Sequence, residues 1–314
     1  MKIVFFGTSE FGAIVLEKLV QARIVPILVV TTEDKPVGRK QMLTPSPVKQ
    51  IATKYQIPML HPTYHTNFAI AELVQRGADL FIVAAYGKIL SKEVLHIPTY
   101  GALNVHPSLL PKYRGPSPIQ TAILNGDKET GVTIILMDEK IDHGPIVANT
   151  RYKIQDTRYI YTELHNKLAE IGAELLIKTI PAWVEGNIRP VPQDDSKATY
   201  TKIFKKEDGR IDWKKPAEYI ERQVRALNPW PGTYSKCQMS NVKCQNNFKI
   251  LKIFRADIVE AKGKPGEIFF YNGKLAVYTG NDALLVEQLQ LEGGKAMSSR
   301  DFFLGHKAYN ILLL

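Results

Sequence analysis

The sequence predicts an α/β domain with a Rossmann-like, mostly parallel sheet, followed by a second, small β-barrel domain. Three observations indicate this. Apolar runs alternate with helical patterns over residues 1–192, as in a parallel sheet covered by helices on both faces. After residue 206 the apolar runs are short and separated by glycines and Asn-Gly or Asn-Asp pairs, which is typical of an antiparallel barrel. The chain has 314 residues, more than one typical domain.

The first domain is expected to begin with a strand at residues 2–6, a glycine turn and a helix whose apolar residues recur at helical spacing. Further strands are expected at residues 24–32, 80–85, 101–106 and 131–137, with 145–152 able to pair beside the last. Helices are expected at residues 67–76, 119–124 and 161–184.

The connection after the second strand is unusually long for a compact α/β domain, where about two to six residues are usual. Residues 32–49 carry three prolines, one glycine and four basic residues. Ser46 followed by Pro47 predicts a helix start. The segment is either a functional insertion or a solvated surface loop.

Residues 193–206 are polar and lack apolar periodicity, which predicts a linker. The second domain is then expected at residues 207–314. It begins with a helix at 216–227, which N-P-W-P-G-T at 228–233 ends. Short strands are expected at 249–253, 266–271, 274–278 and 283–290.

The charge and composition narrow the function classes. Residues 201–314 hold 19 Lys and Arg against 12 Asp and Glu, so they carry +7 of the net charge of +10. A basic lobe suits a polyanion, although a merely soluble basic surface has the same charge. We expect a cytoplasmic protein without a membrane span or secretion signal. Cys237 and Cys244 form no metal pattern and are expected to be reduced thiols.

The stretch at residues 101–115 reads G-A-L-N-V-H-P-S-L-L-P-K-Y-R-G. Asn104 and His106 are two residues apart, so in a strand their side chains point to the same face. Pro107 ends the strand, because proline lacks the N–H that a sheet requires. Both side chains therefore lie at the carboxyl end, where open α/β sheets bind ligands. Asp142 follows the next strand and supplies a carboxylate.

The stretch N-V-H-P-S-L-L-P-K-Y-R-G resembles the signature of the folate-dependent formyltransferases. The segments V-R-A-L-N-P-W-P-G and D-F-F-L-G resemble marks of that family's second domain, and the match continues to Gly305. The resemblance implies the formyltransferase fold, an OB-like second domain and a catalytic triad of Asn104, His106 and Asp142. It also implies formyl transfer from 10-formyltetrahydrofolate by direct attack of an amine through a tetrahedral intermediate.

Within the family, the chain is similar to the branch that formylates methionyl initiator tRNA, a step of translation initiation. In that branch the long connection is an inserted loop, so Lys35, Arg39 and Lys40 are implied tRNA contacts. A small-substrate N-formyltransferase acting on a sugar nucleotide or purine precursor would share the triad. So would a formyl-folate hydrolase, whereas a non-catalytic tRNA-binding protein would not need it. We expect a monomer without membrane partners.

Folate is expected against the backbone of residues 86–90 and 137–142, on the argument that both segments leave the sheet at the same edge as His106. The resemblance adds residues 108–111. The predicted folate contacts are Tyr86, Gly87, Lys88, Ile89, Leu90, Ser108, Leu109, Leu110, Pro111 and Asp138. His143 stands where the family commonly has threonine, and no histidine has metal-ligand spacing, so no metal is expected.

Overall fold

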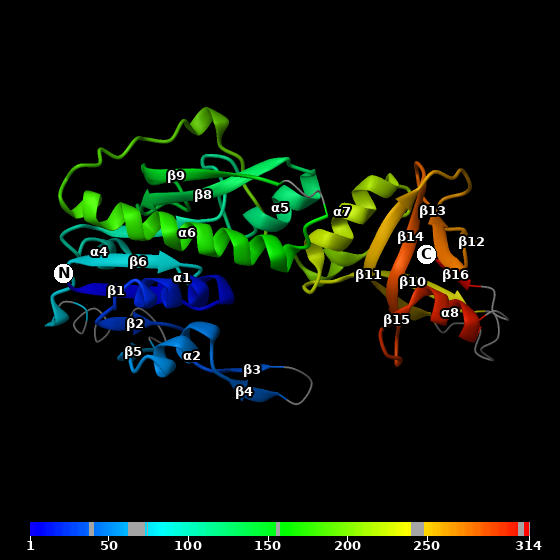
Figure 1. Cartoon of the computed structure of the whole chain (residues 1–314), viewed down its shortest axis with the longest axis horizontal. Coiled ribbons are helices and arrows are strands. Elements are labelled where there is room, and N and C mark those ends of the chain that lie inside the picture. Colours follow the sequence, from blue (N-terminus) through cyan, green and yellow to red (C-terminus); the bar gives the residue numbers. More distant parts are fainter. Residues whose placement is uncertain are drawn as a thin grey trace. The chain divides into compact units, whose positions relative to one another are not determined.

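The computed structural model describes residues 1–37, 41–61, 73, 75–154, 158–239, 248–306 and 311–313. The chain divides into two compact units (Figure 1). The first unit comprises Met1–Pro118, Glu129–Lys153 and Leu164–Thr201, and the second comprises Ile119–Lys128, Ile154–Glu163 and Lys202–Leu314. Most of the expected helix at 67–76 lies outside the described residues.

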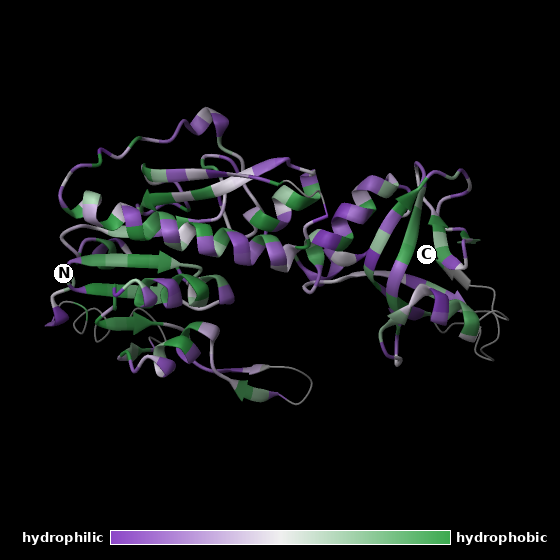
Figure 2. Ribbon diagram, viewed as in Figure 1, coloured by the Kyte–Doolittle hydropathy of each residue, from purple (hydrophilic) through white to green (hydrophobic). Residues whose placement is uncertain are grey.

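The first unit contains a seven-stranded sheet with the order β5-β2-β1-β6-β7-β8-β9. The strands are β1 (Ile3–Gly7), β2 (Leu28–Val30), β5 (Met59–Leu60), β6 (Leu80–Ala84), β7 (Ala102–His106), β8 (Glu129–Leu136) and β9 (Ile146–Lys153). The first five strands of that order are parallel, and β8 and β9 are antiparallel additions. Strands β1, β2 and β6 are buried throughout and apolar along their length (Figure 2). The predicted mostly parallel sheet is confirmed.

Described helices of the first unit include α1 (Glu10–Gln21), α2 (Pro47–Lys54), α4 (Lys92–Leu95) and most of α6 (Tyr161–Val184), whereas α5 (Pro118–Asn125) belongs to the second unit apart from its first residue. Helix α6 approaches the sheet closely at Gly172, where an added Cβ would lie 2.7 Å from Val105 of β7 and 3.2 Å from Val132 of β8. Because side chains alternate along a strand, Asn104 and His106 leave β7 on the face opposite α6.

The long connection after β2 contains a pair of strands that the sequence did not predict. Strands β3 (Lys35–Val37) and β4 (Met42–Thr44) pair antiparallel. The predicted start of α2 is confirmed, because the Ser46 hydroxyl accepts a hydrogen bond from the Lys49 backbone N–H at 3.0 Å. Arg39 and Lys40 lie outside the described residues.

The second unit is built on an antiparallel sheet with the order β12-β13-β14-β11-β10-β16, with β15 beside β14. Its elements are the short helix η2 (Lys206–Gly209), α7 (Ala217–Leu227), β10 (Thr233–Met239), β11 (Lys249–Val259), β12 (Ile268–Tyr271), β13 (Lys274–Tyr278), β14 (Ala283–Leu291), β15 (Met297–Ser298), α8 (Ser299–His306) and β16 (Ile311–Leu313). A Cβ on Gly266, just before β12, would lie 3.3 Å from the Leu313 carbonyl oxygen. The two ends of the sheet therefore approach each other, as in the barrel-like domain that was predicted.

Candidate active site

The candidate site begins at the carboxyl end of β7. Asn104 is half-buried and His106 is only 4% exposed. Between them Val105 is buried under α6, which fixes the strand and sends the two polar side chains to the other face. The expectation that an amide and an imidazole leave the sheet side by side is confirmed.

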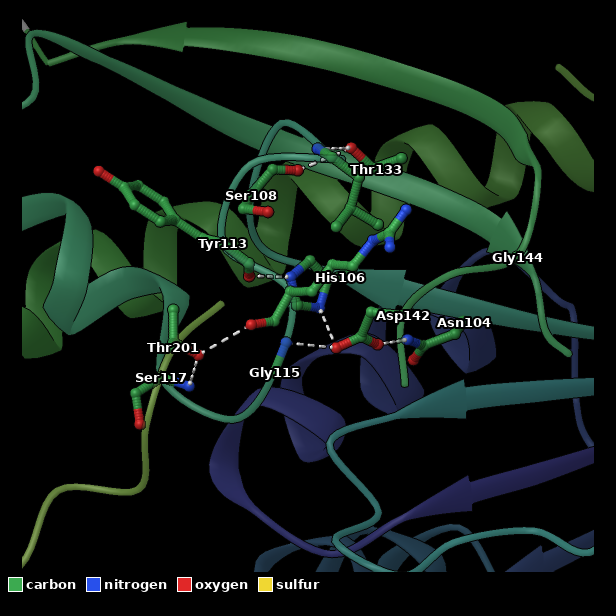
Figure 3. A network of polar contacts seen from close by, with 12 residues as sticks. Asn104, His106, Ser108, Tyr113, Gly115, Ser117, Thr133, Asp142, Gly144 and Thr201 are labelled. Atoms are coloured by element: carbon green, nitrogen blue, oxygen red, sulfur yellow. Dashed lines mark hydrogen bonds and ion pairs between the residues drawn. The ribbon is translucent and has the colours of Figure 1, made fainter. Parts of the chain in front are cut away.

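Asp142 joins this pair (Figure 3). Its Oδ1 accepts a hydrogen bond from Asn104 Nδ2 at 3.2 Å, and its Oδ2 lies 3.5 Å from His106 Nδ1. Oδ2 also accepts the Gly115 backbone N–H at 2.8 Å. The three side chains that were predicted to act together are therefore in one cluster.

The route by which Asp142 reaches the cluster differs from the expectation. Residues 137–142 were expected to leave the sheet at the same edge as His106, and this is wrong. Strand β8 is antiparallel to β7, so Leu136 lies opposite Leu103 and the Met137 N–H donates to the Ala102 carbonyl at 2.8 Å. The segment after β8 starts at the beginning of β7 and must fold back. Gly144 permits this, because an added Cβ would lie 1.9 Å from the Leu136 carbonyl oxygen.

One hydrogen bond determines which nitrogen of His106 can accept a proton. His106 Nε2 lies 2.9 Å from the Tyr113 carbonyl oxygen. A carbonyl can only accept, so Nε2 carries a hydrogen in the neutral as well as the charged ring. The lone pair of the neutral ring is therefore on Nδ1, which faces the Asp142 carboxylate. A proton taken up at Nδ1 forms an ion pair with that carboxylate.

Residues 108–115 follow Pro107, and we call this segment the brace because its backbone binds the cluster. The Ser108 hydroxyl donates to the Lys112 carbonyl at 2.6 Å. Thr133 of β8 donates to the Ser108 carbonyl at 2.7 Å and accepts the Leu110 N–H at 3.1 Å. These hydrogen bonds fix the signature segment, which carries the Tyr113 carbonyl that orients His106. The sequence reasoning missed Thr133.

Arg114 is the most deeply buried charged residue of the brace, with 1% of its surface exposed. Its guanidinium donates to Gln193 Oε1 from Nε at 3.0 Å and from Nη2 at 2.8 Å. It also donates to Asp195 Oδ1 at 2.8 Å and to the Tyr200 hydroxyl at 3.2 Å. These partners lie in the segment predicted as a linker, so the sequence reasoning missed them. The one indication of these partners is physical: an arginine that is buried needs polar or charged partners, because burying an unpaired charge is costly.

The predicted folate segment at residues 86–90 leaves β6, which is parallel to β7, at the expected edge. The Tyr86 side chain packs in the core with its ring edge-to-face against Phe6, the two ring centroids 5.5 Å apart, and burial raises the pKa of its hydroxyl to about 12. Leu90 is also buried, whereas Ile89 is 73% exposed. A ligand here would meet backbone groups and the Ile89 side chain. The side chains of Ser108 and Leu110 are likewise buried.

His143 points to carboxylates outside the cluster. Its Nδ1 lies 2.5 Å from Asp138 Oδ2, and its Nε2 lies 3.4 Å from Asp195 Oδ2. The hydrogen bond from Arg114, helped by the charges of Arg114 and His143, lowers the pKa of Asp195. His143 is thus part of the polar network on the Asp195 side and is separate from His106.

The described residues contain no group of three or more His, Cys, Asp and Glu side chains arranged to hold a metal ion. Cys237 is buried, and this burial raises the pKa of its thiol; Cys244 lies outside the described residues. No helix in the described part of the chain is long and apolar enough to cross a bilayer.

Known proteins with similar sequences share both parts of the chain. The family model for formyl transferase matches residues 1–180, and the model for the formyl transferase C-terminal domain matches residues 203–307. The chain is 40% identical over 317 residues to the methionyl-tRNA formyltransferase of Staphylococcus aureus strain bovine RF122 / ET3-1, which covers 99% of this chain and 98% of the relative. The relative from strain Newman is also 40% identical, over 309 residues.

Solved structures show the same fold at lower identity. An N-formyltransferase from Helicobacter canadensis, in complex with folinic acid and dTDP-3-aminofucose, matches with a TM-score of 0.64 and 19% identity over 91% of this chain and 98% of that chain. HypX from Aquifex aeolicus in complex with tetrahydrofolic acid also has a TM-score of 0.64 and 19% identity, over 96% of this chain and 47% of that one. With both family models matched and 40% identity maintained along nearly its whole length, the chain belongs to the formyl transferase family.

Proposed function

We propose that this enzyme transfers the formyl group of 10-formyltetrahydrofolate to the α-amino group of methionyl initiator tRNA. The observation that carries the proposal is the contact of Asn104, His106 and Asp142 at the carboxyl end of β7. The names of the Staphylococcus aureus relatives support methionyl-tRNA as the acceptor. The folates bound to the two solved relatives support a folate donor.

In the first step the neutral amine attacks the formyl carbon, and the carbonyl electrons move onto oxygen. An α-amine has a pKa of about 7.7–8.0, so a useful fraction is neutral near pH 7. Asn104 uses one of its two N–H groups on Asp142, and its second N–H can donate to the developing oxyanion. This donor strengthens as negative charge grows, which lowers the barrier.

In the second step the new ammonium loses a proton to His106 Nδ1, the ring nitrogen that carries the lone pair. Asp142, 3.5 Å away, stabilises the resulting imidazolium. The bond between the formyl carbon and N10 then breaks, and N10 takes a proton from the imidazolium. The balance is one amide formed and tetrahydrofolate released, without a covalent enzyme intermediate.

The tRNA would be held by two parts of the chain. We propose that Lys35, with Arg39 and Lys40, contacts the acceptor end from the connection that carries the β3–β4 hairpin. The basic excess of residues 201–314 would bind the tRNA phosphates. In this division residues 1–192 are catalytic, 193–206 link the domains and 207–314 bind tRNA. We further propose that the enzyme acts as a cytoplasmic monomer.

An acceptor comparison tests the proposal. Purified enzyme with 10-formyltetrahydrofolate is given initiator methionyl-tRNA, free methionine, an amino-sugar nucleotide or buffer alone, and the formylated product and released tetrahydrofolate are measured. We expect formyl-methionyl-tRNA as the dominant product. A higher kcat/KM for the amino-sugar nucleotide would support the small-substrate alternative, and release of formate in buffer alone would indicate a hydrolase.

A further inference from the structure

The Gln193 side chain connects the backbone around Asp142 with a buried cation. Its Nε2 donates to the carbonyls of Asp142 and Gly144, each at 2.8 Å. Its Oε1 accepts from Arg114 Nε at 3.0 Å and Nη2 at 2.8 Å. A primary amide has two N–H donors and two acceptor lone pairs, and all four are used. Such a fully satisfied amide has one orientation.

Arg114 stands between the two residues whose backbone holds the catalytic cluster. The carbonyl of Tyr113 accepts from His106, and the N–H of Gly115 donates to Asp142. The Arg114 backbone is fixed in turn, because its N–H donates to the Thr199 carbonyl and its carbonyl accepts the Thr201 N–H, both at 2.8 Å. Residues 193–201 thus form hydrogen bonds with both the side chain and the backbone of Arg114.

The Asp142 backbone needs such support. Its φ is +48°, in the left-handed region that costs a non-glycine residue free energy unless its surroundings hold it there. The segment that carries Asp142 also reaches the cluster only by folding back from the far end of β8. Gln193 binds this returning segment on both sides of His143, at residues 142 and 144.

We propose that Gln193 and Arg114 form a clamp that positions the Asp142 carboxylate against His106 and Asn104. The polar segment at residues 193–201 is then a working part of the active site as well as a connection. Gln193 is a positioning residue, because it contacts the backbone of Asp142 and none of the reacting atoms. The inference rests on the proposed function, because its test measures the rate of the proposed reaction.

Two substitutions of Gln193 distinguish its contact with Arg114 from its contacts with the carbonyls of Asp142 and Gly144. Gln193→Glu keeps a side chain that can pair with Arg114, but it replaces the two N–H donors with an oxygen that repels the carbonyls of Asp142 and Gly144. Gln193→Met keeps the length and removes every hydrogen bond. The matched control is Gln223→Met in the second unit, where a buried glutamine Nε2 also donates to two carbonyls, those of Asp208 at 2.8 Å and Arg210 at 3.3 Å.

The first measurement is kcat for the formylation of methionyl-tRNA at saturating substrates, with the folate dissociation constant and thermal unfolding measured in parallel. A misplacement of about 1 Å can reduce a rate by about 10²-fold, so we expect both Gln193 variants to lose roughly 10–10²-fold in kcat with folate binding unchanged. Gln223→Met should keep the wild-type kcat even if its melting temperature falls. Wild-type kcat in a folded Gln193→Glu variant would overturn the clamp.

A double-mutant cycle distinguishes positioning from general destabilisation. Asp142→Gly removes the carboxylate, and glycine tolerates the positive φ of that residue. If Gln193 acts through Asp142, adding Gln193→Met to Asp142→Gly causes no further loss of rate, whereas independent effects would multiply. Multiplying losses would contradict the proposal. The wild type is the control for the reaction itself: if it fails to formylate methionyl-tRNA, the proposed function fails, and if it succeeds, the result concerns the clamp alone.

Discussion

His106 has a single nitrogen that can accept a proton. The Tyr113 carbonyl holds the hydrogen on Nε2, which leaves Nδ1 as the base. Asp142 faces Nδ1 at 3.5 Å and binds Asn104 through its other oxygen. In the proposed mechanism the same carboxylate orients the oxyanion donor and stabilises the charged base, so we expect the three residues to act as one unit.

His143 provides a test of this assignment. Its two ring nitrogens face Asp138 and Asp195, and neither contact serves the proton path through His106. We expect His143→Thr to keep nearly the wild-type kcat, while His106→Ala, measured alongside, loses activity strongly. A collapse of kcat in His143→Thr equal to that of His106→Ala would show that the proton acceptor is misassigned.

At the same scale, some site residues could be predicted from the sequence and others could not. Asn104 and His106 follow from the two-residue period of a strand that Pro107 ends. The clamp could not be predicted, because Arg114 and Gln193 are 79 residues apart and their contact depends on how a polar segment folds over the brace. Polar residues without periodicity carry no sequence signal for such a contact.

At the scale of single elements, α6 carries a buried histidine. The His165 ring packs edge-on against Phe11 of α1 at 5.6 Å, and burial lowers the pKa of His165 below its usual 6.5, against the opposing effects of Asn166 and Glu10. Below about pH 6.5 the unfolded chain therefore binds a proton more readily than the folded protein. This contribution to stability is complete above pH 6.5 and is lost as the pH falls through the folded-state pKa.

We therefore expect the free energy of unfolding, measured with urea, to fall between about pH 7 and pH 5 with a contribution from His165 of at most about 1.4 kcal/mol per pH unit. His165→Phe removes the titrating group and keeps an aromatic ring. Its pH slope should be shallower than that of the wild type. Equal slopes in the two proteins would contradict the role given to His165.

The sequence did not predict the β3–β4 hairpin, because Pro36 within β3 argues against a strand.

Arg39 falls between the two strands in the sequence. Arginine offers a planar fork of donors for base edges and phosphates. We expect Arg39→Ala to weaken the binding free energy for tRNA by about 1–3 kcal/mol and to reduce the preference for initiator over elongator methionyl-tRNA. The measurement is the ratio of kcat/KM for the two tRNAs, and an equal loss on both would make Arg39 an ordinary phosphate contact.

At the scale of the whole molecule, the charge is concentrated toward the C-terminus, with +7 of the net +10 in residues 201–314. Lys252 on β11 is exposed and lies within this basic part. Replacing a lysine that contacts phosphate should weaken tRNA binding for all sequences and reduce the slope of log K against log salt by about one unit. We expect this of Lys252→Ala in a salt titration. A change that differs between initiator and elongator tRNA would contradict a purely electrostatic role.

The overall architecture was predictable where burial follows a simple pattern. The central strands of the first sheet are buried on both faces and read as apolar runs. Strand β10 was missed because its inward residues are Thr233, Ser235 and Cys237, all buried, so apolar alternation is weak. Its hydroxyls are satisfied inside, for example by the Thr233 donation to the Ile253 carbonyl at 2.7 Å. The antiparallel direction of β8 was not predicted, because residues 131–137 read as an apolar run like those of the parallel strands.

The most direct test of the account is the single-turnover rate of formyl transfer to initiator methionyl-tRNA in Asn104→Ala at saturating folate. The proposed mechanism predicts that the rate falls by about 10²–10³-fold, the usual cost of removing an oxyanion donor, while the dissociation constant for the folate is unchanged. A wild-type single-turnover rate in this variant would contradict the oxyanion role of Asn104 and with it the proposed reaction at this site.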